Sequence, residues 1–321
     1  MSAAEKSPSA EADTSVDSAL PPSLPRPSNK NTNKNKKAAV LAVLAKGPSR
    51  IDAFLAHLAK CMQTRTGAET VLLFVCYATR LAGSILEGVG GAAIRQSARR
   101  LVALAYKLPP ATTVVMASTT PQPSLAAVAL QMGGRFKALS AVISETRTVA
   151  RLWGLLGLYF AAKRLVLKSV AAKAEQEQQE EEDSAESTFD TLVAYAQITS
   201  LIVFQASENA AFLSSKKVLP LAPATQSRLG LLSVRAWGLY VAMEGARLLV
   251  ERSRKQSSGL AAKDAEWAEN WNKSFYRNLS WAPLTVHWGS TTGGFLPDIA
   301  ISLLGFYPAV GAMTDLWKGT A

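Results

Sequence analysis

The uncharged run Leu152–Ala162 constrains this chain more than any other segment. It is shorter than the roughly 20 apolar residues that a membrane-spanning helix needs, yet it is too apolar and too aromatic to suit water. Cations bracket the run, with Arg147 and Arg151 before it and Lys163, Arg164 and Lys168 after it. This arrangement is typical of a helix at the boundary between lipid headgroups and acyl chains. A buried core helix with solvated ends remains the alternative for this segment taken alone.

The composition favours an anionic partner. Hydrophobic residues make up 48% of the 321-residue chain, and the formal net charge is +11 with a pI near 9.7. Such a surplus of cations suits phospholipid headgroups or nucleic acid. The two cysteines, Cys61 and Cys76, do not build a disulfide framework.

The order of polar and apolar segments predicts a tail followed by two helical halves. Residues 1–48 read as a disordered polar and basic tail, because little in them could be buried. Residues 49–170 form the N-terminal helical half, and residues 171–188 form an acidic linker of low complexity. Residues 189–321 form a C-terminal half with an aromatic helix and an apolar hairpin. No alternation typical of strands persists, so the expected class is all-α, a membrane-associated protein with amphipathic and borderline transmembrane helices.

A basic amphipathic helix is predicted over residues 92–108. Ile94, Leu101 and Leu104 share one face, whereas the cations lie on the opposite face and no acid is present. A soluble surface helix normally mixes both signs, so this pattern favours an anionic membrane surface over an ordinary packing helix. The cluster Gly88–Gly91 is expected to end the preceding helix, 69–86. The residues expected to contact the membrane are Arg95, Arg99, Arg100, Leu101, Leu104, Lys107, Arg151, Trp153, Lys163 and Arg164.

Four further segments have apolar patterns that do not show whether they lie in a membrane or in a protein core. One helix is expected over residues 136–170. The uncharged run Thr191–Ser207 would cover about 25 Å, which is borderline for a bilayer core and equally consistent with half-buried packing. The helix 266–281 carries tryptophans along one side, as core helices and interfacial helices both do. Residues 299–314 contain Gly305 and Pro308 and are expected to form a hairpin or a re-entrant segment.

The sequence contains no convincing catalytic or metal-binding motif. His57 and Cys61 lie four residues apart, but the paired close spacings of zinc modules are missing. Neither His57 nor His287 lies near a Gly-x-Ser-x-Gly elbow, and Gly88–Gly91 lacks the Lys-Ser/Thr of a phosphate-binding loop. We therefore expect no enzymatic activity, no cofactor and no metal site.

Several blocks, taken in order, resemble the peroxin-11 family and more narrowly its fungal peroxin-11C branch. They are Ser97-Ala-Arg-Arg-Leu-Val-Ala-Leu-Ala105, Leu139-Ser-Ala-Val-Ile-Ser144 with Arg151-Leu-Trp-Gly-Leu-Leu-Gly157, Glu208-Asn-Ala-Ala-Phe-Leu-Ser-Ser215, and Asn278-Leu-Ser-Trp-Ala-Pro-Leu-Thr-Val-His-Trp288. The resemblance implies a protein of the peroxisomal membrane that promotes elongation and division of the organelle. It also implies self-association and contact with the fission machinery and with a membrane-protein import receptor. The family's membrane-deforming helix corresponds to residues 92–108.

Together these patterns predict a non-enzymatic peroxisomal membrane protein that remodels and elongates the membrane in peroxisome proliferation and fission. One alternative is a solute pore or carrier of the same membrane, which requires polar residues facing a lumen inside complete spans. Neither borderline run holds an ionisable pair of its own. A basic nucleic-acid-binding protein is a weaker alternative, because the aromatic residues lie in apolar segments and not among the cations. No nucleic-acid partner is expected.

Overall fold

The computed structural model describes residues 50–109, 125–176, 184–257 and 264–321. Its contacts divide the chain into a unit Met1–Leu55 and a unit Ala56–Ala321, and the second unit contains all of the longer helices. The predicted tail, 1–48, lies outside the described residues, as does the centre of the predicted acidic linker, 177–183.

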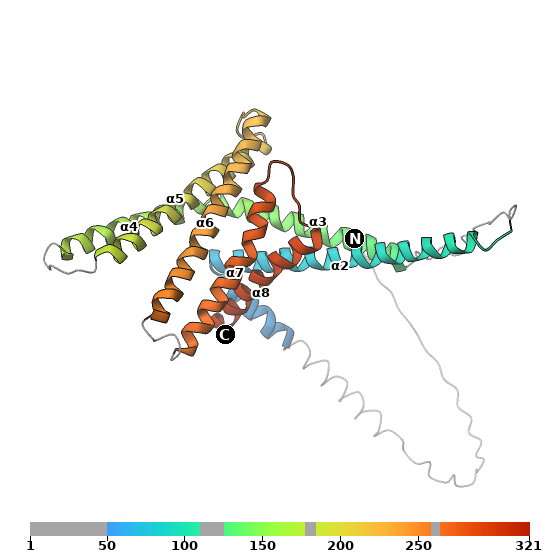
Figure 1. Cartoon of the computed structure of the whole chain (residues 1–321), viewed down its shortest axis with the longest axis horizontal. Coiled ribbons are helices and arrows are strands. Elements are labelled where there is room, and N and C mark those ends of the chain that lie inside the picture. Colours follow the sequence, from blue (N-terminus) through green and yellow to red (C-terminus); the bar gives the residue numbers. More distant parts are fainter. Residues whose placement is uncertain (1–49, 110–124, 177–183, 258–263) are drawn as a thin grey trace, which may run out of the picture. The chain divides into compact units, whose positions relative to one another are not determined.

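The described part of the chain contains helices and no strand, which confirms the all-α prediction (Figure 1). A short helix that ends at residue 62 precedes the others. The longer helices are α2 (Arg65–Ala105), α3 (Leu125–Arg151), α4 (Gly154–Gln176), α5 (Ser184–Ser215), α6 (Pro223–Ser257), α7 (Ala265–Gly289) and α8 (Asp298–Thr320). Within the described ranges, three segments are long and apolar enough to cross a membrane, namely α2, Phe189–Ser215 of α5, and α8.

The helices pack in an order that differs from their order in the sequence. Helix α2 lies along α3 and also contacts α8, while α6 lies between α5 and α7. Helix α4 packs on α5, and α7 contacts α8 (Figure 1). Because α8 lies against α2, the two helical halves expected from the sequence belong to a single compact unit.

The cluster Gly88–Gly91 does not end a helix as expected, because α2 continues through it from Arg65 to Ala105. Gly90 is buried against α3, where an added Cβ would lie 3.0 Å from the carbonyl oxygen of Ala126. Gly83 and Gly133 form a second close approach, since a Cβ on Gly133 would lie 3.0 Å from the Gly83 oxygen. Small residues permit such backbone contacts between helices. Packing against α3 thus offsets the cost of about 1 kcal/mol that each internal glycine imposes.

The single helix expected over residues 136–170 is broken. Helix α3 ends at Arg151 and α4 begins at Gly154, with a turn between them. Side chains from other helices satisfy the carbonyl groups at this turn: Asn209 donates to the Leu152 oxygen at 3.2 Å, and Arg65 donates to the Trp153 oxygen at 3.2 Å. The break is therefore stabilised by residues distant in sequence, which a periodic pattern does not reveal.

The hairpin or re-entrant segment expected over residues 299–314 is also wrong, because α8 is one continuous helix with Pro308 inside it. Contacts along its length hold α8 against α2 and against the short helix that ends at residue 62. Gly305 lies so close to Tyr77 that an added Cβ would overlap the ring. Near the end of α8, Thr320 lies 3.0 Å from His57 and 3.1 Å from Cys61. These contacts stabilise a proline-containing helix that local propensity alone would break.

The aromatic side of α7 packs mainly inside the protein. Trp271 is 5% exposed, and its indole nitrogen donates to the Leu248 oxygen of α6 at 2.8 Å. Its ring stacks on Phe275 with a centroid distance of 4.8 Å. Around Trp271, α7 is therefore a core helix and not an interfacial one.

Candidate functional site

Two features of the described structure are candidates for function: a polar cavity among the helices and the exposed basic end of α2. The cavity has a volume of about 910 Å³ and is lined by residues of α2, α3, α5, α6, α7 and α8. Five cations and four acids line it: Arg80, Lys137, Arg147, Arg151 and Lys216, with Glu69, Glu145, Glu208 and Asp298.

The first group of charges joins α2, α3 and α5. Arg151 binds Glu208 through two nitrogens, with distances of 2.8 and 2.7 Å. Arg147 binds Glu69 at 2.9 Å, and Arg151 approaches the same Glu69 oxygen at 3.8 Å. Lys216, in the turn directly after α5, forms a further ion pair with Glu145 of α3. The pairs with Glu69 thus join α3 to α2, whereas the pair Arg151–Glu208 joins α3 to α5.

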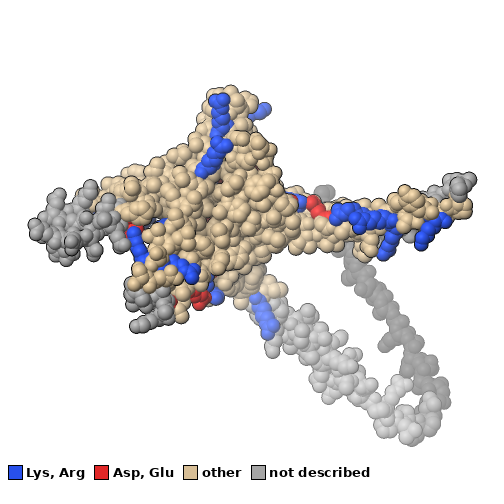
Figure 2. All heavy atoms as spheres, viewed as in Figure 1, with Lys and Arg blue, Asp and Glu red and all other residues tan. Residues whose placement is uncertain are grey.

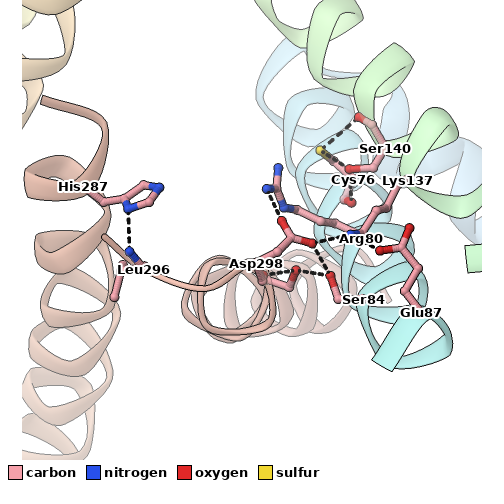
Figure 3. Close-up of polar contacts among 10 residues, drawn as sticks. Cys76, Arg80, Ser84, Glu87, Lys137, Ser140, His287, Leu296 and Asp298 are labelled. Carbon is pink, nitrogen blue, oxygen red and sulfur yellow. Dashed lines mark hydrogen bonds and ion pairs between the residues drawn. The ribbon is translucent and has the colours of Figure 1, made fainter. Parts of the chain in front are cut away.

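The second group of charges centres on Asp298, the first residue of α8 (Figure 3). Its carboxylate accepts from Arg80 at 2.6 Å and from Ser84 at 2.6 Å, and pairs with Lys137 at 2.7 Å. Lys137 also binds Glu87 at 2.5 Å. An acid in the first turn interacts favourably with the helix dipole. One carboxylate therefore joins α8 to both α2 and α3.

Two cations of α3 that line the cavity, Lys137 and Arg151, have raised pKa values. Burial by itself would lower the pKa of the Arg151 guanidinium, but its hydrogen bonds to Glu208 and the charges of Glu208 and Glu69 outweigh burial and raise the pKa. Burial would likewise lower the pKa of Lys137, but hydrogen bonds to Asp298 and Glu87 outweigh it and raise the pKa. Both side chains remain charged across the physiological pH range.

Aromatic rings form another part of the cavity wall. Trp237 contacts Trp281 at a centroid distance of 5.4 Å and stacks near Trp288 at 6.2 Å. Tyr77 contacts Trp281 edge-on at 5.8 Å, and Phe204 lies 6.4 Å from Trp237. All five residues line the cavity. The cavity thus combines charged groups, mostly from α2 and α3, with aromatic groups, mostly from α5, α6 and α7.

Two buried polar atoms at this cavity have no hydrogen-bond partner among the described residues. They are the Oε2 atom of Glu69, which can accept, and the Nε group of Arg80, which can donate. Leaving such groups unpaired costs free energy, so water or a ligand is the expected partner for each.

Apart from Arg151, the charged residues of this cavity were not predicted as site residues. Their sequence pattern was an isolated charge inside an apolar run, such as Arg80 in α2 and Glu208 in α5. In each of these ion pairs the two residues belong to different helices. A single apolar run of the sequence therefore never shows both members of a pair. Ionisable groups within apolar spans commonly mark functional sites.

We expect the pair Arg151–Glu208 to contribute measurably to stability. In a double-mutant cycle with Arg151→Met and Glu208→Gln, the coupling should be about 0.5–3 kcal/mol, as for contacting residues in one network. Thermal unfolding of the purified chain measures it. The exposed pair Lys273–Glu269, four residues apart on α7, is the matched control and should give a weaker coupling, because water screens exposed charges. Equal coupling for both pairs would contradict the expectation.

The second candidate site is the exposed end of α2. The helix ends at Ala105 and not at Leu108, and its side chains from Arg95 to Ala105 are all exposed. Both faces of the amphipathic pattern are free among the described residues, with Leu101, Val102 and Leu104 between 42% and 55% exposed. Figure 2 shows cations gathered along this end of α2. Arg95, Arg99, Arg100 and Lys107 are all exposed, and their contact with a membrane stays a prediction.

Helix α4 and the turn before it carry most of the other predicted membrane contacts on their surface. Trp153, Lys163 and Arg164 are exposed, and Trp153 is 68% exposed. Arg151 differs, because its guanidinium pairs with Glu208 and Glu69 at the cavity. Its expected role as a flanking membrane cation stays a prediction, and the structure adds a role as an interhelix ion-pair partner.

The described histidines and cysteines do not form a single cluster. His287 accepts from the Leu296 backbone N–H at 2.9 Å, and Cys76 lies 3.5 Å from Ser140. Cys61 and His57 meet at Thr320. Among the described residues no group of three or more potential ligands could hold a metal ion.

Comparison with known proteins gives no match: no family model, no curated protein and no solved structure is similar to this chain.

Proposed function

We propose that this chain is a non-enzymatic protein of the peroxisomal membrane that remodels and elongates the membrane during peroxisome proliferation and fission. The observation that carries the proposal is the end of α2, where an apolar face and an acid-free basic face both remain exposed. Such a helix gains free energy by burying its apolar face at the lipid interface and by holding its cations near anionic headgroups.

Helix α4 supports the proposal as a second interfacial element. It packs chiefly on α5, and its apolar side chains Leu156, Tyr159, Phe160 and Leu167 are all more than half exposed. An apolar surface of this extent marks an interaction site. Together with three apolar segments of spanning length, it favours a lipid environment for the helical unit.

The peroxisomal location and the expected partners rest on the resemblance to the peroxin-11 family. Fluorescence microscopy of the tagged chain tests the location directly. Extraction of the membrane fraction with alkaline carbonate tests integration: an integrated protein stays in the pellet, whereas a nucleic-acid-binding protein is released. Localisation to another compartment would contradict the peroxisomal assignment.

Leu156→Asp should release or mislocalise the protein. An acid at lipid depth costs up to about 2.5–3.5 kcal/mol on insertion scales. Since Leu156 is 57% exposed in the helical unit, the substitution should not unfold it. Membrane fractionation measures the release, circular dichroism measures helicity, and Leu156→Ala is the control that adds no charge. A parent protein that is never membrane-bound, together with an aspartate variant that aggregates, would favour a soluble helical core.

A solute pore or carrier is a second candidate function, favoured by the charged cavity among the apolar helices. The requirement for polar residues facing an internal space is met by pairs such as Arg151–Glu208, which form between helices. Vesicles that contain the purified chain and a trapped small anion test this function. Release at the rate of protein-free vesicles would contradict it.

A further inference from the structure

The cavity among α2, α3, α5, α6, α7 and α8 has two chemically different walls. Its charged wall includes Arg147, Arg151 and Glu69, and its aromatic wall includes Trp237 and Trp281. A purely polar ligand would leave the aromatic wall in water, and a purely apolar ligand would desolvate the charges without pairing them. The walls together suit a molecule with a charged head and an apolar body.

The charged wall suits a head that carries both signs. Cations and acids line it in nearly equal number, so the site does not favour a ligand of large net charge. Arg147 binds Glu69 through its Nε and Nη2 atoms, and a guanidinium has five N–H donors, so its Nη1 group can face a phosphate. Glu69 holds that guanidinium in place through one oxygen, while its Oε2 atom is buried without a partner among the described residues. An ammonium group would satisfy this oxygen.

Size and access are consistent with such a ligand. The volume of about 910 Å³ lies within the range of roughly 300–1,000 Å³ that is usual for ligand sites. The lining residues Glu145 and Lys216 are 52% and 48% exposed, so the cavity reaches the protein surface beside them. A headgroup can therefore lie inside while acyl chains extend outward along the apolar surfaces of the helices.

We propose that this cavity binds the headgroup of a single phospholipid that carries a primary ammonium group. The phosphate lies against Arg147 and Arg151, and the ammonium donates to Oε2 of Glu69. The apolar part of the lipid lies against the aromatic wall, and its acyl chains leave through the opening beside Glu145 and Lys216. This inference shares with the proposed function only the premise that the chain meets lipid, because it concerns one bound molecule and not adhesion to a surface.

Native mass spectrometry of the full chain in detergent tests the binding. With phosphatidylethanolamine added, we expect one retained molecule per chain. Phosphatidylglycerol, which lacks the ammonium, should be retained about tenfold less, and diacylglycerol, which lacks the headgroup, should not be retained. Glycerophosphoethanolamine has the same headgroup without acyl chains. Its retention at the same level as the lipid would overturn a lipid in favour of a soluble ligand.

Paired substitutions identify the residues involved. Glu69→Gln with Arg147→Gln removes one charge of each sign and should lower retention of phosphatidylethanolamine about tenfold. The matched control is Glu244→Gln with Arg247→Gln, which removes an ion pair of 2.7 Å on α6 that does not line this cavity. Ser144→Trp fills the cavity without removing a charge and should also reduce retention, so the test survives if the paired variant fails to fold. Equal retention by all folded variants would overturn the proposal.

The result is separable from that of the proposed function. Vesicle binding depends on the end of α2, whereas lipid retention in detergent depends on the cavity. Normal vesicle binding with no retained lipid would overturn the inference alone, and retained lipid without vesicle binding would overturn the proposed function alone.

Discussion

Replacing Arg95, Arg99 and Arg100 with alanine should lower partitioning of the protein onto anionic vesicles by roughly a hundredfold. Each basic residue near an anionic surface contributes about 1 kcal/mol, so three contribute about 3 kcal/mol. All three side chains are exposed at the end of α2, beyond the part of the helix that packs on α3. The substitution should therefore leave the helical unit folded. Vesicle sedimentation measures partitioning, and the thermal unfolding midpoint checks the fold.

The control for this result is a variant with the same loss of charge elsewhere. Lys60, Arg135 and Arg228 are exposed cations outside the end of α2, and replacing them with alanine also removes three positive charges. Binding of the parent should weaken as salt rises, because salt screens exposed charges. If the two triple variants bind equally, net charge and not the amphipathic helix determines the interaction.

Gly133→Leu should separate α2 from α3 and destabilise the helical unit. An added Cβ would lie 3.0 Å from the Gly83 oxygen and 3.1 Å from the Glu87 nitrogen, and backbone atoms cannot move aside as a flexible side chain does. Overpacking of this kind costs about 1–3 kcal/mol or more. The separation would also strain the contacts of Lys137 with Glu87 and Asp298 one turn further along α3. Thermal unfolding in detergent measures the loss.

The adjacent residue provides a matched control. A Cβ on Gly134 meets nothing within 4 Å, so Gly134→Leu introduces the same side chain without a clash. Because glycine disfavours helix interiors by about 1 kcal/mol, this variant should be as stable as the parent or slightly more stable. Similar destabilisation by both substitutions would contradict the close approach of α2 and α3 at Gly133.

Local patterns were sufficient to predict the helical class and the basic end of α2. The face shared by Leu101 and Leu104 follows from the helical period, which relates residues three and four positions apart. The exposed cations of α4, Lys163 and Arg164, likewise follow from their places beside an apolar run. These properties depend on neighbours within one or two turns, so the sequence by itself determines them.

Tertiary structure decided where the helices end and which charges meet. Gly88–Gly91 and Pro308 read as helix breakers, but packing of α2 on α3 and of α8 on α2 keeps both helices continuous. Arg151 read as a membrane anchor, but its partner Glu208 lies 57 positions away in the sequence, and Asp298 lies 218 positions from Arg80. A periodic pattern contains no information about such distant partners. The cavity and its ion pairs therefore exist only once the helices have packed, because the low-dielectric interior makes each buried charge depend on a partner that another helix supplies.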